Sequence, residues 1–270
     1  MEILKIILYG IIEGITEWLP VSSTGHLIIV ERFLKFNYSA EFIDMFRVVI
    51  QFGAILAVIV LYFKKIWPFT LKEKYFIKLD TFMMWLKIAA ACIPAAIVGV
   101  FFDEYFEALF YNDLSVAIAL IVVGVIFIII ENKKPKTKID SINEITFQSA
   151  IIIGICQLIA AIFPGVSRSG ATILGALLLG VSRTIAAEFT FFMAVPVMLG
   201  ASLLKIMKFG FSFNQSELIA LAVGMLVSFV TSLLVIKFLM NYIKKHDFKA
   251  FGYYRIVLGI VVILIMLLGL

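Results

Sequence analysis

The sequence predicts an all-α, polytopic membrane protein with six transmembrane helices and two re-entrant helix pairs, arranged as an inverted repeat. Three observations support this fold class. Hydrophobic residues make up 63% of the 270 residues and charged residues only 15%, against about 25% charged residues in an ordinary soluble domain. Long apolar runs recur along the chain, and two of them are interrupted by proline, glycine and hydroxyl residues. This composition excludes an ordinary soluble enzyme.

Six apolar segments are long enough to cross a bilayer, because a helical span needs about 20 apolar residues. They cover residues 42–63, 82–102, 114–130, 186–207, 217–239 and 251–270. Residues 3–30 and 145–180 are also apolar, but residues 18–26 and 163–170 break them with Pro, Gly and consecutive hydroxyls. Such breaks cannot continue a lipid-facing helix. We therefore expect two half-helices in each, which enter the membrane and return to the same side.

One re-entrant pair and three spans in each half place the second half in the opposite orientation, because three crossings is an odd number. The chain should therefore be one membrane domain made of two inverted repeats, residues 1–135 and 136–270. A shift of 144 residues supports the repeat, since it lays Gly10 on Gly154, Pro20 on Pro164 and Ser23 on Ser167, with Glu13 opposite Gln157.

The basic residues predict the sidedness. With the N-terminus outside, fourteen Lys and Arg, Lys72 and Lys74 among them, fall in inside loops and five fall outside. The acidic loop 103–113, which holds no base, also falls outside, as the positive-inside rule requires. We expect a multi-pass protein of the plasma membrane with both termini outside.

Two acids at membrane depth are the first candidates for chemistry. Glu13 and Glu17 are four residues apart, which places both carboxylates on one helical face. Each would cost about 2.5–3.5 kcal/mol if it faced lipid, so they should face a wet cavity or a partner. A structural ion pair between Glu17 and Arg168 is one interpretation. The other is a divalent cation, Mg²⁺ or Ca²⁺, held by Glu13 and Glu17 together with substrate phosphates.

The first break supplies hydroxyls and a histidine. Ser22, Ser23 and Thr24 are natural N-caps for the returning half-helix, and a helix N-terminus also binds anions. His26 follows Ser23 by three residues, so the two side chains could form a nucleophile and its base. Packing is the alternative role of His26, and capping that of the hydroxyls.

The second break adds a guanidinium. Arg168 lies where a half-helix should begin, and its positive charge there opposes the helix dipole unless an anion lies between them. Its planar fork of donors suits phosphate oxygens. Ser167, Ser169 and Thr172 could bind the same anion, with Ser167 as the cap. Gln51, in the middle of a span, either lines this cavity or packs.

Other polar residues have structural interpretations. Asp44 and Arg47, three residues apart, should pair with each other at a helix end. Arg183 and Glu188 flank a turn and should be structural. Arg255 follows two tyrosines and should be an anchor at the membrane interface.

The segments EGITEWLPVSSTGH (13–26) and PGVSRSGAT (164–172) resemble the two signature motifs of the undecaprenyl-diphosphatase, or bacitracin-resistance, family. The resemblance covers essentially the whole chain. It implies a divalent-cation-dependent membrane hydrolase, open to the outer face, that converts undecaprenyl diphosphate to undecaprenyl phosphate and inorganic phosphate. This reaction recycles the lipid carrier of cell-wall synthesis. Carried over by motif position, the functional residues are Glu13, Glu17, Ser23, His26, Ser167, Arg168 and Thr172.

Several alternatives stay open at this point. The nucleophile is Ser23, His26 or water. A transporter or flippase for a prenyl-phosphate lipid, without hydrolysis, is the second function, because broken helices in inverted repeats are common in transporters. A lipid phosphatase with a histidine nucleophile fits poorly, because His246 lies in an inside loop away from His26. The expected partners are a prenyl diphosphate lipid and membrane lipids, with no nucleic acid, and a homodimer is an option.

Overall fold

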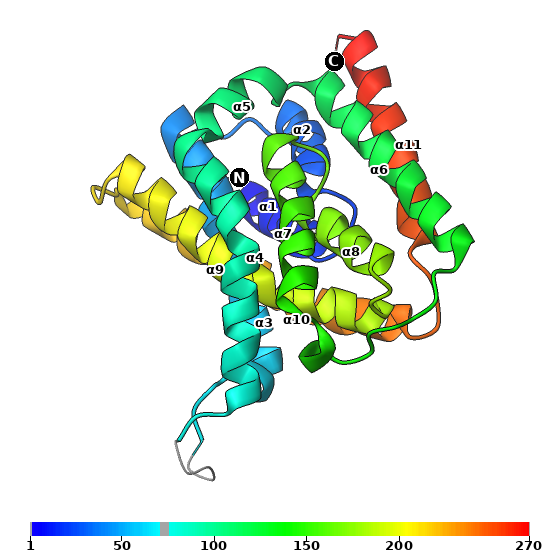
Figure 1. The fold of residues 1–270 in the computed structure, drawn as a ribbon. Coiled ribbons are helices and arrows are strands. Elements are labelled where there is room, and N and C mark those ends of the chain that lie inside the picture. The colour runs from blue at the N-terminus through cyan, green and yellow to red at the C-terminus, as the bar shows by residue number, and fades with distance from the viewer. Residues whose placement is uncertain (1, 71–75, 270) are drawn as a thin grey trace.

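The computed structural model describes residues 2–70 and 76–269, most of which are helical (Figure 1). The six predicted spans are confirmed as helices long and apolar enough to cross a membrane. They are α3 (Ala40–Ile66), α4 (Leu79–Phe101), α6 (Asp113–Lys133), α9 (Arg183–Phe209), α10 (Gln215–Ile243) and α11 (Lys249–Leu267). Of the lysines assigned to the inside, Lys72 and Lys74 lie outside the described residues.

Both predicted interruptions are breaks between two shorter helices. The first separates α1 (Glu2–Thr16) from α2 (Ser23–Phe33), and the second separates α7 (Phe147–Ile162) from α8 (Arg168–Leu178). The elements after the breaks match in length between the halves. α2 and α8 have 11 residues each, and α3 and α9 have 27 each.

Two short helices lie in segments that the sequence interpretation left as loops. α5 (Asp103–Phe110) fills most of the acidic loop 103–113 and ends just before Asn112, whose side chain caps α6. The 3-10 helix η1 (Ile142–Glu144) precedes α7 and starts with a capping box. Hydropathy alone did not reveal them because both are short and partly polar.

Helices of one half pack on helices of the other. α1 lies against α10, and its counterpart α7 lies against α4, while α3 packs on α9 and α6 on α11. Figure 1 shows α6 and α11 side by side along one edge of the molecule. Their close approach depends on two glycines, since a Cβ on Gly124 would lie 2.7 Å from the Gly252 carbonyl oxygen. This packing encloses the helix breaks between the long helices.

The predicted pairing of Asp44 with Arg47 is wrong. Asp44 binds Lys205 of α9 at 2.7 Å, and Arg47 binds Glu31 of α2 at 2.6 Å. Both partners come from other helices, so tertiary contacts replace the local pair. These ion pairs connect α3 to both halves of the chain.

Candidate active site

The two breaks end in matching N-caps. Ser22 and Ser167 have positive φ values of 72° and 71°, and their hydroxyls accept the backbone N–H groups of Gly25 (3.5 Å) and Gly170 (3.2 Å). The caps are therefore 145 residues apart, so the predicted match of Ser23 with Ser167 is wrong by one residue. Between the proline and the cap, the second break has two residues and the first has one, and this shifts the register by one residue.

In the corrected register, Ser23 and Arg168 occupy equivalent positions as the first residues of α2 and α8. Both contact the same carboxylate. Ser23 Oγ donates to Glu17 Oε2 at 3.4 Å, and Arg168 Nη2 donates to Glu17 Oε1 at 2.9 Å. The second terminal nitrogen of Arg168 donates to the Thr190 carbonyl at 3.1 Å, and its guanidinium lies 5.9 Å from the Trp18 ring centre. The structure thus brings one hydroxyl, one carboxylate and one guanidinium together. The pair of Glu17 with Arg168 is the ion pair that the sequence offered as one of two interpretations.

Glu13 lies one turn before this centre and is fully buried. Neither of its carboxylate oxygens has a hydrogen-bond partner among the described residues. Its electrostatic neighbours are Glu17, Gln51 and Arg168. Two buried oxygens without donors fit a cation ligand, and the described residues contain no group of three or more His, Cys, Asp or Glu that could hold a metal. If a divalent cation binds here, Glu13 and Glu17 are the side chains that could hold it, together with water or phosphate oxygens, as is common for Mg²⁺.

The other predicted anion ligands divide into two groups. Ser169 and Thr172 are buried, and their hydroxyls donate to backbone carbonyls, at 3.2 Å to Glu17 and at 2.9 Å to Arg168. The Ser169 hydroxyl thus links α8 to the backbone at Glu17, and the Thr172 hydroxyl bonds within α8. Thr24 and the cap Ser167 are half-buried at the start of their helices.

The structure does not bring His26 to Ser23. The Nδ1–H group of His26 donates to the Ser22 carbonyl at 2.7 Å, which leaves Nε2 as the acceptor for the Tyr254 hydroxyl, also at 2.7 Å. The rings of His26 and Tyr254 are stacked. The polar group next to the serine hydroxyl is Glu17, so the predicted pairing of Ser23 with a histidine base is wrong in this structure.

The prediction that Arg255 is an interfacial anchor is wrong, because the residue is fully buried. Its Nη1 donates to the Pro20 carbonyl at 3.3 Å, and its Nη2 donates to the carbonyls of Gly165 at 2.7 Å and Val166 at 3.0 Å. It therefore contacts both breaks at once. The prediction was based on the two tyrosines that precede Arg255, because tyrosines next to a basic residue are typical of the membrane interface.

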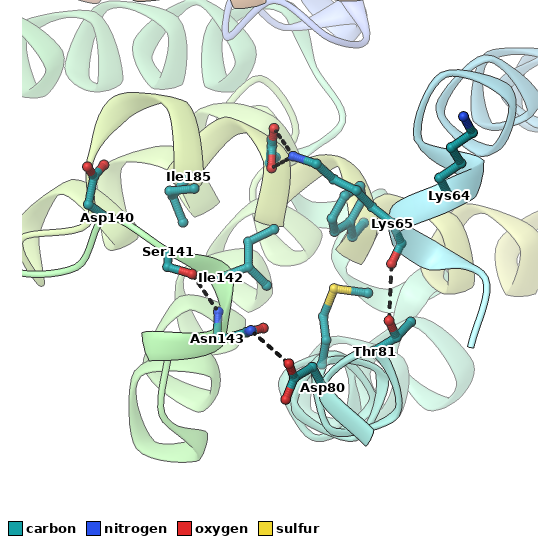
Figure 2. Close-up of a pocket in the computed structure, with 12 residues that line it drawn as sticks. Lys64, Lys65, Asp80, Thr81, Asp140, Ser141, Ile142, Asn143 and Ile185 are labelled. Atoms are coloured by element: carbon teal, nitrogen blue, oxygen red, sulfur yellow. Dashed lines mark hydrogen bonds and ion pairs between the residues drawn. The ribbon is translucent and has the colours of Figure 1, made fainter. Parts of the chain in front are cut away.

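A cavity of about 320 Å³ lies elsewhere, between α3, α4, η1 and α9 (Figure 2). Lys65 donates to both carboxylate oxygens of Glu188 at its edge, at 2.9 Å each. Arg183 binds Glu131 with two hydrogen bonds near the same end of α9. The structural roles predicted for Arg183 and Glu188 agree with these pairs. None of the residues around Glu17 lines this cavity.

The fold and the site define a class: a polytopic membrane protein with a buried carboxylate–guanidinium centre at the N-termini of α2 and α8. Such N-termini with a guanidinium suit phosphate groups. The chain belongs to the family described as "Bacitracin resistance protein BacA", whose model matches residues 6–261.

Known relatives match along almost the full length. The chain is 59% identical over 266 residues to the undecaprenyl-diphosphatase of Desulfitobacterium hafniense, covering 98% of this chain and 96% of that protein. It is 58% identical over 270 residues to undecaprenyl-diphosphatase 1 of Clostridium acetobutylicum, covering 99% and 98%. The undecaprenyl-diphosphatase of Enterococcus faecalis is 56% identical over 269 residues, covering 98% and 97%.

Proposed function

We propose that this protein is an undecaprenyl-diphosphate phosphatase of the plasma membrane. It hydrolyses the diphosphate to undecaprenyl phosphate and inorganic phosphate, which returns the lipid carrier to cell-wall synthesis and gives resistance to bacitracin. The observation that carries the proposal is the shared carboxylate: Glu17 accepts one hydrogen bond from each half-helix start, from Ser23 and from Arg168. The names of relatives at 56–59% identity favour hydrolysis over transport alone.

Each side chain has a role in the proposed reaction. Ser23 Oγ attacks the terminal phosphorus and loses its proton to Glu17, while the bond from that phosphorus to the bridging oxygen breaks and undecaprenyl phosphate leaves. Water then cleaves the phosphoserine and releases phosphate. Arg168 and the free N–H groups of the half-helices stabilise the charge on the phosphate oxygens. His26, whose ring links α2 to α11, stays a predicted site residue in a supporting role.

Glu13 and Glu17 are the proposed ligands of a divalent cation, Mg²⁺ or Ca²⁺. The unpartnered, fully buried oxygens of Glu13 support this assignment. A bound cation neutralises phosphate charge and makes the phosphorus more electrophilic. Gln51 lies beside Glu13 and is proposed to orient it or a water molecule.

The two halves are proposed as inverted repeats, residues 1–135 and 136–270. The matched lengths of α2 and α8 and of α3 and α9 support this. So does the exchange of partners, since α1 packs on α10 and α7 packs on α4.

Both termini are proposed to lie outside, with the site open to the outer face. Single cysteines at Thr137 and Ser212, both exposed, test this sidedness in a background without Cys92 and Cys156. A membrane-impermeant thiol reagent on intact cells should label Ser212→Cys only. Labelling of Thr137→Cys instead would reverse the topology.

The activity is tested by phosphate release from farnesyl and undecaprenyl diphosphate by the purified protein, with and without chelator. Glu17→Ala and Arg168→Ala should abolish release. Arg183→Ala is the matched control, because its ion pair with Glu131 lies away from the site. A transporter without hydrolysis would release no phosphate in any of these samples.

A further inference from the structure

Arg255 joins the two breaks from a third element. It lies on α11, is 0% exposed, and reaches the carbonyl of Pro20 in the first break and those of Gly165 and Val166 in the second. Its Nη1 also lies 3.3 Å from where a Cβ on Gly170, at the start of α8, would stand. The close contact of α6 with α11 at Gly124 places Arg255 at this depth.

The three carbonyls need these donors. They belong to segments without helical hydrogen bonds, and an unpaired carbonyl away from water costs several kcal/mol in a membrane. One planar guanidinium satisfies carbonyls of both breaks and so fixes their separation. Ser23 and Arg168 follow these breaks directly, so Arg255 sets the distance between the proposed nucleophile and the proposed phosphate ligand.

The charge of Arg255 is also unusual. No acidic side chain in residues 2–70 or 76–269 forms an ion pair with it, although a buried charge normally has such a partner. With the proposed divalent cation bound, ionised Glu13 and Glu17 together with Arg168 would sum to one positive charge. Arg255 raises the sum to two, which favours a diphosphate more than a ligand of lower charge.

We propose that Arg255 is a positioning residue of the diphosphate site, which fixes the spacing of the two half-helix starts and adds a buried positive charge that favours diphosphate binding. This inference rests on the proposed function. It predicts that the neutral variant Arg255→Met loses more affinity for a diphosphate than for a monophosphate, because a diphosphate carries more negative charge. A role in folding alone would weaken the two ligands equally.

The test measures binding of methylenediphosphonate and of inorganic phosphate to the purified full-length protein by calorimetry, and turnover of farnesyl diphosphate in parallel. Arg255→Met should weaken diphosphonate binding about 100-fold and phosphate binding about tenfold or less. Arg255→Lys keeps the charge but not the fork, so its diphosphonate binding should stay within tenfold while kcat falls at least tenfold. The matched controls Arg183→Met and Arg183→Lys should change each value less than threefold.

The outcomes separate the inference from the proposed function. If the wild-type protein binds diphosphonate and Arg255→Met binds it equally well, or loses both ligands in equal proportion, the charge role is wrong. If Arg255→Met does not fold, Arg255→Lys decides alone, and an unchanged kcat overturns the positioning role. If the wild-type protein neither binds diphosphonate nor releases phosphate, the proposed function itself fails.

Discussion

The ion pair between Glu17 and Arg168 makes a quantitative prediction about stability. The nitrogen and oxygen are 2.9 Å apart, and the side chains are only 9% and 13% exposed, so solvent screens the charges little. Charges about 4 Å apart interact by about 4 kcal/mol at an effective dielectric constant of about 20. Removing one partner of a buried pair costs about 3–5 kcal/mol, because the other charge stays buried alone. Arg168→Met and Glu17→Gln should each destabilise the protein strongly, and the double variant should cost less than their sum by about 2–3 kcal/mol.

The assay is a double-mutant cycle in mixed micelles, with unfolding by dodecyl sulfate followed by tryptophan fluorescence. Trp18 packs beside Arg168 and should report the change. The exposed pair of Lys208 with Glu104 is the matched control, with side chains 57% and 84% exposed, and its coupling should stay below about 1 kcal/mol. If the effects of Glu17→Gln and Arg168→Met add within about 0.5 kcal/mol, the two residues are not coupled in the folded protein. The carboxylate–guanidinium centre would then be wrong.

Three further predictions concern the nucleophile, the cation and the helix packing. Ser23→Ala should lower phosphate release at least 100-fold with nearly unchanged unfolding, and no labelled phosphoenzyme should form; full turnover would exclude the serine mechanism. Glu13→Gln should raise the Mg²⁺ concentration for half-maximal phosphate release at least tenfold, and an unchanged titration would remove Glu13 from the cation site. Gly53→Ala should lower the melting temperature, because its Cβ would lie 2.1 Å from the Met225 carbonyl oxygen and push α3 from α10. Gly200→Ala is the control, because a Cβ there would have no described neighbour within 4 Å beyond its own helix, and it should be neutral or stabilising. Equal melting temperatures for Gly53→Ala and Gly200→Ala would contradict the packing argument.

The spans and the breaks could be predicted because they depend on local chemistry. A long apolar run can be recognised as a membrane helix without knowledge of its neighbours. α6 extends beyond the predicted 114–130 by one residue at its start and three at its end. Proline, glycine and hydroxyls mark the breaks for the same reason. The meeting of Glu17 with Arg168 followed from their cost in lipid, which only a shared polar site would offset.

The partners of the remaining polar residues could not be predicted, because they come from distant parts of the chain. His26 bonds Tyr254, which lies 228 positions further along the sequence. Arg255 follows Tyr254 and looks like an interfacial residue until the packing of α11 on α6 buries it. A single sequence contains the residue types but not these contacts.

If the two halves are inverted repeats, as proposed, the corrected register accounts for the asymmetry of the site. Equivalent positions hold Ser23 in one half and Arg168 in the other, and both donate to Glu17, which comes from the first half only. The first half thus contributes a hydroxyl and the carboxylate that accepts its hydrogen bond, and the second half contributes a positive charge. The Nε of Arg168 is buried and has no hydrogen-bond partner among the described residues. In the proposed function, a phosphate oxygen would reach this donor only after the side chains around Nε move aside, but it would not need to break the hydrogen bond from Nη2 to Glu17.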